Sequence, residues 1–156
     1  MAGKDEALGI LKYELNDLRL RIIDNHIRAR QKASGRTIAS MRVEVTENSG
    51  ILWGRKAFGT LETGRRPGRV PKGFYKIILD WIEAKGIRVE KPKTFAYFIA
   101  RKIAREGTQL YRDGGRDDIY SKEIDKTIKT IMEKVFGIFE NDIKHINLNS
   151  NEDRRI

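Results

Sequence analysis

Apolar residues near both ends of this chain recur at the spacing of an α-helix, and this pattern constrains the fold more than any other feature of the sequence. Near the N-terminus the residues spaced by three or four are Leu8, Leu11, Leu15, Leu18 and Ile22. Such spacing places all of them on one side of a helix. Because no proline interrupts residues 1–40, we expect a long helix over residues 4–30.

A second series of apolar residues predicts a matching long helix near the C-terminus, over residues 119–145. The series is Ile124, Ile128, Ile131, Val135 and Ile138, broadened by Met132, Phe136, Phe139 and Ile143. The two long helices must pack either against each other or against neighbouring subunits, because each has an apolar side to cover. The last residues, 147–156, are polar, and we expect a flexible tail there.

Two shorter apolar series predict helices over residues 74–85 and 94–106. The first includes Ile78 and Trp81. For the second, the residues expected on its buried side are Phe95, Phe98, Ile99 and Ile103. Gly86 and Gly107 follow the two segments and act as stop signals.

A strand pattern lies between the first and second helices. Met41, Val43 and Val45 alternate with polar residues, and Asn48-Ser49-Gly50 supplies a turn. These features predict an antiparallel hairpin near residues 41–58, and a short segment at 87–90 could add a strand. We therefore expect an α+β fold in a single domain over residues 1–146, with a small antiparallel sheet packed with four helices, two of them long and terminal.

The positive charge of the chain is concentrated in its middle. The net charge is +10, and residues 31–115 hold eighteen basic and eight acidic side chains, whereas the segments on either side are almost neutral. A field of this sign attracts polyanions, either nucleic acid or an acidic partner surface.

Within this basic region, residues 54–73 contain five of the fourteen glycines and two of the three prolines. We expect a long exposed loop, which in a compact domain usually has a function. Its arginines could pair with carboxylates of an adjoining subunit or line a path for DNA. The candidate residues of this assembly or DNA-proximal loop are Arg55, Lys56, Glu62, Arg65, Arg66, Arg69 and Lys72.

The sequence offers little for catalysis. It has no cysteine, and its two histidines lie in separate helical segments. Glu83 and Lys85 resemble a nuclease Glu-x-Lys pair, but in a helix they point about 200° apart. The acids at positions 113, 117 and 118 fit a helix start better than a metal site. We expect no enzymatic activity, no catalytic residues, no metal and no cofactor. The start lacks a signal peptide and no apolar run has the length of a membrane helix, so we expect no membrane contact.

Several short motifs occur in one order over residues 34–110. They are Ser34-Gly35-Arg36-Thr37-Ile38-Ala39-Ser40, Phe58-Gly59-Thr60-Leu61-Glu62-Thr63-Gly64, Trp81, Lys85-Gly86-Ile87, Phe95-Ala96-Tyr97, Ala100-Arg101-Lys102-Ile103 and Glu106-Gly107-Thr108. This order resembles that of the tail-completion proteins, or head–tail connectors, of tailed bacteriophages. The chain departs from that family at Glu62-Thr63-Gly64, where Glu-x-Gly-Thr is more usual, and after Thr108, where Pro and Phe are usual.

The resemblance implies a structural virion protein made in the cytoplasm of a host bacterium and located in the neck or tail region of the particle. It would form a homo-oligomeric ring, a hexamer or a dodecamer, joining the portal and head to the tail around the DNA channel. Its partners would be other neck, portal or tail proteins, with non-specific contact to packaged DNA. The charge distribution keeps an alternative open, a non-specific nucleic-acid-binding protein, whereas a metal-dependent nuclease is a weaker third.

Overall fold

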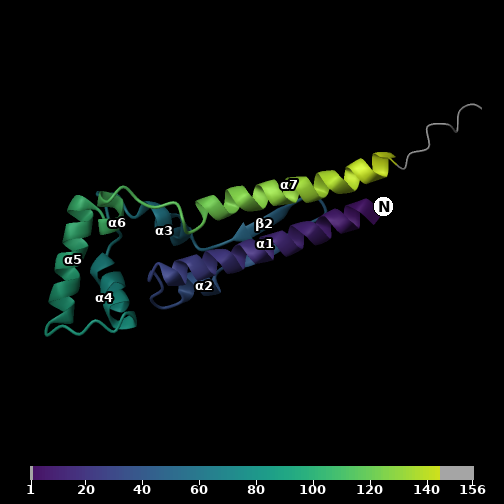
Figure 1. The fold of residues 1–156 in the computed structure, drawn as a ribbon. Coiled ribbons are helices and arrows are strands. Elements are labelled where there is room, and N and C mark those ends of the chain that lie inside the picture. The colour runs from purple at the N-terminus through teal and green to yellow at the C-terminus, as the bar shows by residue number, and fades with distance from the viewer. Residues whose placement is uncertain (1, 145–156) are drawn as a thin grey trace, which may run out of the picture.

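The structure, a computed structural model, describes residues 2–144 and has an α+β fold. Two long helices, α1 (Ala2–Arg28) and α7 (Ser121–Lys144), lie side by side and antiparallel, which confirms both terminal helices. The chain therefore takes the first of the two packing arrangements that the sequence left open. Figure 1 shows the pair forming an elongated rod, with both of its outer ends at the same side of the molecule.

The predicted hairpin is confirmed as a two-stranded antiparallel sheet packed on α1. Strands β1 (Arg42–Val45) and β2 (Gly50–Trp53) pair with Arg42 opposite Trp53. A Cβ atom on Gly50 would lie 2.5 Å from a methyl carbon of Leu15, so a larger residue here would require the Leu15 side chain to shift. The buried core between these elements consists of Leu18, Ile22, Met41 and Ile119.

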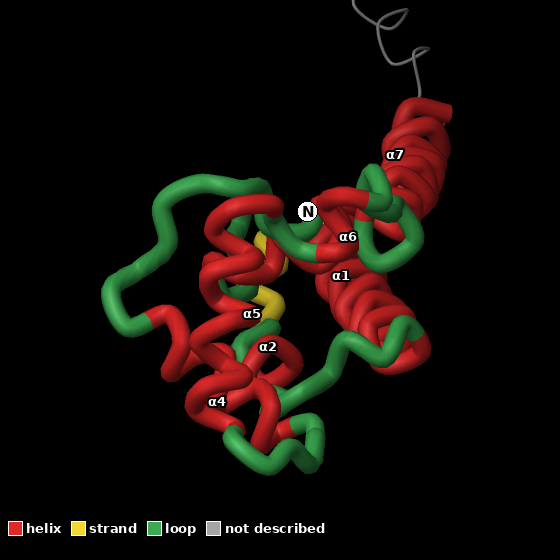
Figure 2. The backbone as a smooth tube through the Cα atoms, turned by 90° about the vertical axis from the view of Figure 1, so that its left-hand side faces the viewer, coloured by secondary structure: helices red, strands yellow, loops and turns green. Residues whose placement is uncertain are grey.

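A second pair of helices has its own core. Helices α4 (Phe74–Ala84) and α5 (Pro92–Glu106) confirm the two shorter predictions, and they bury Ile78, Ile82, Ala96 and Ala100 between them. The small side chains of the two alanines let the helices lie close together. We call residues 64–112, which also include the short helix α6 (Gln109–Arg112), the helical module. Figure 1 shows the module at one end of the α1–α7 pair, and Figure 2 shows α4 and α5 side by side when the molecule is seen from that end.

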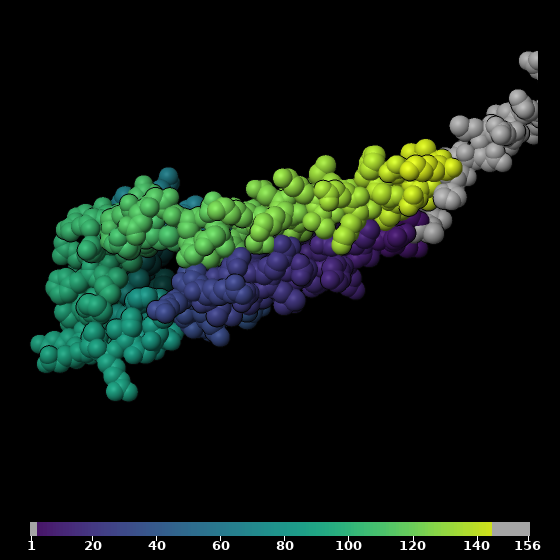
Figure 3. All heavy atoms as spheres, viewed as in Figure 1, coloured from purple at the N-terminus to yellow at the C-terminus, as the bar shows by residue number. Residues whose placement is uncertain are grey.

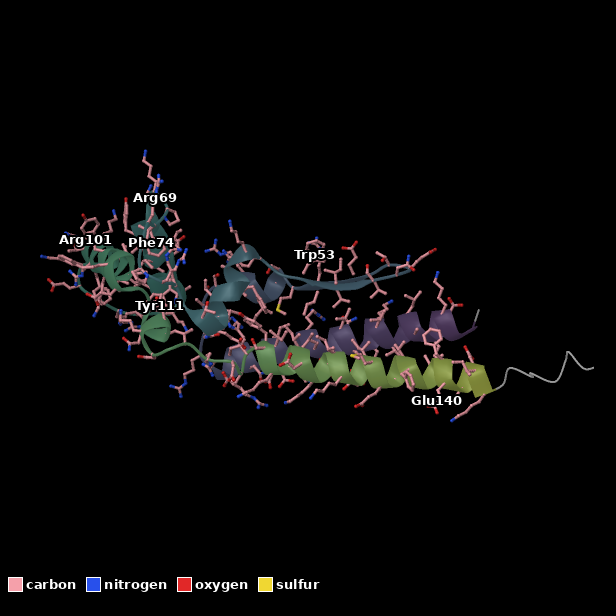
Figure 4. The ribbon with its side chains drawn as sticks, turned by 90° about the horizontal axis from the view of Figure 1, so that it is seen from above. Trp53, Arg69, Phe74, Arg101, Tyr111 and Glu140 are labelled. Carbon is pink, nitrogen blue, oxygen red and sulfur yellow. The ribbon has the colours of Figure 1, made fainter. Side chains whose placement is uncertain are left out.

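We call the remaining described residues, 2–63 and 113–144, the body. Besides α1, α7 and the hairpin, the body contains the short helices α2 (Arg36–Ala39) and α3 (Thr60–Thr63) and the 3-10 turn η1 (Lys56–Gly59). Seen from above, the hairpin, α1 and α7 form successive layers (Figure 4). Within residues 2–144, no helix combines the length and the apolarity needed to cross a membrane.

Three expectations need correction. Residues 54–73 are not one exposed loop, because η1 and α3 occupy residues 56–63. Residues 87–90 do not form a strand, since they join α4 to α5 in the module, away from the hairpin that could pair with them. The buried side of α5 is also different: Phe95 and Phe98 are 41% and 61% exposed, and Ala96 and Ala100 face α4 instead. The expected polar tail at 147–156 lies outside the described residues.

Candidate functional site

The helical module carries almost all of the excess positive charge. It holds thirteen Lys and Arg against four Asp and Glu, a balance of +9 out of the +10 of the whole chain. The body holds seventeen basic and sixteen acidic side chains. The structure thus narrows the basic region from the sequence segment 31–115 to one compact unit.

The two parts also differ in how their charges are paired. Among residues 64–112, the ion pairs of the structure all involve Glu106, which contacts Arg105 and lies 3.8 Å from Arg112. The hydrogen bond from Arg105 lowers the pKa of the Glu106 carboxyl. In the body, ion pairs join α1 to α7, with Arg21 2.6 Å from Glu123 and Lys134 2.6 Å from Glu14. Most module cations therefore face solvent without a carboxylate partner.

The outward surface of α5 combines cations with aromatic rings. Tyr97 and Phe98 are 51% and 61% exposed, and their rings meet edge to face with centroids 6.3 Å apart. Arg101 follows one turn later on the same side and extends from the end of the molecule (Figure 4). We call the surface of these three residues with exposed Lys102 and Arg105 the outer α5 face. Exposed rings between cations are typical of surfaces that bind nucleic acid strands.

The candidate residues predicted from the sequence are divided between the two parts. Arg65, Arg66, Arg69 and Lys72 lie in the module, where Arg65 donates a hydrogen bond of 2.9 Å to the carbonyl of Arg69. The Arg65 guanidinium also lies 5.3 Å from the centre of the Phe74 ring. The structure therefore brings these four together on the basic unit.

Arg55 and Lys56, by contrast, lie in the body at the start of η1, where both are exposed. The backbone N–H of Arg55 donates to the hydroxyl of Ser40, 3.1 Å away. They belong to the surface beside α2 rather than to the module.

Glu62 does not belong to an exposed surface at all. Its side chain is buried, with only 3% of the residue exposed, and Oε1 accepts hydrogen bonds from the backbone N–H groups of Ile119, Tyr120 and Ser121 at 2.6–2.9 Å. Oε2 accepts from the Ser121 hydroxyl. A carboxylate is favoured there because the first N–H groups of a helix have no partner within it. Glu62 caps α7 and is a structural residue.

The surroundings of Glu62 tie the middle of the chain to both long helices. The backbone N–H of Arg116 donates to the Glu62 carbonyl at 2.8 Å, and the Gln31 amide donates to the Leu61 carbonyl at 2.7 Å. Burial, and secondarily the charge of Glu62, raises the pKa of Tyr120. We call this set of contacts the Glu62 joint.

Sequence reasoning missed the outer α5 face. Phe98 of this face has helical spacing together with Phe95, and this spacing led to the prediction that Phe95 and Phe98 are buried. The available signal was the charge count, because Arg101, Lys102 and Arg105 fall inside the basic segment 31–115. Within residues 2–144, no three His, Cys, Asp or Glu side chains form a group that could hold a metal ion.

A cavity of about 630 Å³ lies where the module meets the body. Its lining includes the apolar side chains of Phe74, Ile78 and Ile103 from the module and of Leu61 from α3 of the body. Five cations and no carboxylate occur among the described lining residues; these cations are Arg30, Arg65, Lys85, Lys102 and Arg112. We call this cavity the module pocket, and Figure 3 shows the hollow between the two parts.

Helix α7 leaves half of its apolar side uncovered. One side, with Thr127 and Ile138, is buried against α1. An adjacent series of large side chains is between 36% and 68% exposed, and we call it the α7 stripe: Ile124, Ile128, Met132, Phe136, Phe139 and Ile143. A continuous exposed apolar strip of this kind is more often a surface that binds a partner than a surface that stays exposed to solvent.

Comparison of the chain with protein-family models, with curated protein sequences and with solved structures finds no match.

Proposed function

We propose that this chain is a structural subunit of a homo-oligomeric ring in the neck or tail-completion region of a tailed-phage particle. The order of short motifs over residues 34–110 supports this proposal, as does a fold built for contact with neighbours. The protein acts by assembly, and it carries no catalytic step.

The observation that carries the proposal is the α7 stripe. Six large apolar side chains, spaced by three or four residues, stay exposed along the whole length of α7. A monomer in water gains free energy by covering such a surface, at about 25 cal/mol for each Å² removed from water. A subunit that is always surrounded by copies of itself covers the stripe in this way.

The charge distribution is consistent with a ring around DNA. The body has nearly balanced and paired charges, which suits packing between subunits, because unpaired like charges would repel. The module has a balance of +9 and few ion pairs. In a ring with its modules toward the channel, this charge attracts the phosphates without reading the base sequence.

Quantitative mass spectrometry of purified particles from the phage that encodes the chain tests this proposal. We expect the chain at a fixed copy number of six or twelve per particle, measured against the portal protein. A chain absent from washed particles, or present at a variable trace level, contradicts the assignment.

Non-specific nucleic-acid binding is the second candidate function, and the outer α5 face is the observation that favours it. On this account the chain binds DNA or RNA as a free protein, without joining a particle. Titration of single- and double-stranded DNA at several salt concentrations distinguishes the two. Tight binding by a monomer, together with absence from particles, favours the second function.

A further inference from the structure

The two ends of the molecule have complementary surfaces, and we propose that the C-terminal part of α7 from one copy, residues 136–143, docks into the module pocket of the next copy. This inference rests on the ring-forming function proposed above and specifies its interface. The contact is head to tail, so each subunit uses one surface as donor and a different one as acceptor.

The donor surface is the last part of the α7 stripe. Phe136, Phe139 and Ile143 lie on one side of the helix within two turns, and they are 68%, 50% and 67% exposed. Two exposed carboxylates accompany them: Asp142, and Glu140, which forms an ion pair of 2.8 Å with Lys144. This end is thus an apolar ridge flanked by carboxylates.

The acceptor surface has the opposite charge and a matching apolar lining. The module pocket contains Phe74, Ile78 and Ile103, and its volume of about 630 Å³ falls in the range of ~300–1,000 Å³ usual for binding pockets. Within residues 2–144, two of its cations, Lys85 and Lys102, form no ion pair, although the Lys85 ammonium donates a hydrogen bond to the Arg30 carbonyl. The Nε atom of Arg65 is buried without a hydrogen-bond acceptor in the described part of the chain. A carboxylate from a neighbour would pair with these groups.

The geometry prevents the contact from forming within one chain. Helix α7 has 24 residues, which corresponds to a length of about 36 Å. Figure 4 shows Glu140 near the outer end of α7 and Arg69 and Arg101 at the opposite end of the molecule. The ridge of one copy can therefore reach only the pocket of another copy.

A contact between two different surfaces has a consequence for the assembly. Such a heterologous interface leaves one free ridge and one free pocket after every addition, so growth stops only when the chain of subunits closes on itself. Head-to-tail docking of this kind produces a cyclic ring when the rotation between neighbours closes, as the proposed function requires, and an open filament when it does not. A two-fold symmetric interface would instead stop at a dimer.

The test uses two variants that each lose one surface. The ridge variant is Phe136→Asp with Phe139→Asp, both at exposed positions. The pocket variant is Lys85→Glu with Lys102→Glu, which reverses two lining charges. The matched controls are Leu20→Asp, which introduces an acid at a 56% exposed apolar position of α1, and Lys93→Glu, which reverses an exposed charge of the module outside the pocket. Circular dichroism checks that each variant is folded.

We expect light scattering to show rings for the wild type and both controls, and monomers for each variant alone. Mixing the two variants should restore one contact only, between the ridge of the pocket variant and the pocket of the ridge variant. The mixture should then stop at a pair of twice the 18.0 kDa chain mass. A rescue variant, Lys102→Glu combined with Glu140→Lys, should recover part of the ring population.

Other outcomes overturn the inference in distinguishable ways. If the wild type forms rings and either folded variant still does, the interface lies elsewhere and only this inference fails. The same holds if native mass spectrometry finds a small molecule in the pocket of intact rings. If the wild type stays monomeric at all concentrations and is absent from particles, the proposed function fails as well.

Discussion

The body and the helical module both contain many charged side chains, but the two parts differ in how these side chains are paired. The body uses its charges internally, since Arg21, Glu14 and Glu123 all join α1 to α7. The module is held together by an apolar contact between α4 and α5 and leaves its cations in solvent. Charge that is not needed for folding is free for a partner, so we propose the module as the polyanion surface and α7 as the assembly surface.

Breaking the Glu62 joint within the body should have the largest effect on stability. In a Glu62→Ala variant the N–H groups of Ile119, Tyr120 and Ser121 lose their buried acceptor. We expect the free energy of unfolding to fall by about 3 kcal/mol, measured by urea denaturation. Glu83→Ala removes an exposed carboxylate on α4 and serves as control. Equal stability of the two variants would contradict the capping role.

Removing cations from the outer α5 face should weaken nucleic-acid binding more than removing the same number of cations from the body. Replacing Arg101, Lys102 and Arg105 by alanine should lower the slope of log affinity against log salt by about 2–3, roughly one for each lost phosphate contact. The measurement is a fluorescence-anisotropy titration with a DNA of arbitrary sequence. The control replaces exposed Lys122, Lys126 and Lys129 on α7, which removes the same charge from the body. Equal losses in both variants would show that net charge alone matters.

The sequence correctly predicted the structural features that depend on residues close together in the chain. Helical spacing and strand alternation are local, and they located the four main helices and the hairpin. The role of Glu62 depends on residues 57–59 positions away, so no local pattern could show it. Nearby acids seemed the natural caps of α7, but Asp118 contacts Arg116 and Asp117 contacts Lys122.

The same limit explains the errors on α5 and the candidate site. Phe95 and Phe98 share helical spacing with buried residues, yet Ala96 and Ala100 face α4, because small side chains allow the two helices to approach. The spacing of apolar residues identifies the apolar surface of a helix. It does not show which residues of a broad apolar surface pack against a neighbouring helix. The basic segment was visible as a charge count, whereas its division between body and module required the fold.

The ion pairs of the body should contribute a smaller amount to its stability. The Arg21 guanidinium lies 2.6 Å from Glu123 and 2.9 Å from Asp17, and its side chain is one-third exposed. An Arg21→Met variant should lose about 1 kcal/mol, because solvent screens part of the attraction. The exposed pair of Arg28 with Asp24 offers a control, and Arg28→Met should change the unfolding free energy by less than about 0.5 kcal/mol. Thermal denaturation measures both, and the reverse order would contradict this account.

The smallest effect should appear in acid. The hydrogen bonds from Arg116 lower the pKa of Asp118. Burial opposes a lowered pKa at Glu123, but the combined contacts with Lys126 and Arg21 outweigh it, and the pKa of Glu123 is lowered as well. A carboxyl with a lowered folded-state pKa stabilises the fold above its unfolded value of about 4. This contribution disappears as the pH falls through the folded value.

Urea midpoints measured at pH 5 and pH 3 should therefore decrease toward acid, and an Asp118→Asn variant should show a slightly smaller decrease. Asp125→Asn, at an exposed position of α7, should behave as the wild type does. If the urea midpoint decreases more in the Asp118→Asn variant than in the wild type, the stabilising role of the Asp118 carboxylate is contradicted.

Native mass spectrometry of the purified chain at micromolar concentration tests the central claim most directly. If the chain assembles through the α7 stripe into a closed ring, the spectrum should contain one dominant species of six or twelve copies of the 18.0 kDa chain. Its population should fall when Phe136 and Phe139 are replaced by aspartate. A wild-type spectrum of monomers, or of an open-ended series of oligomers without a preferred size, would contradict the account.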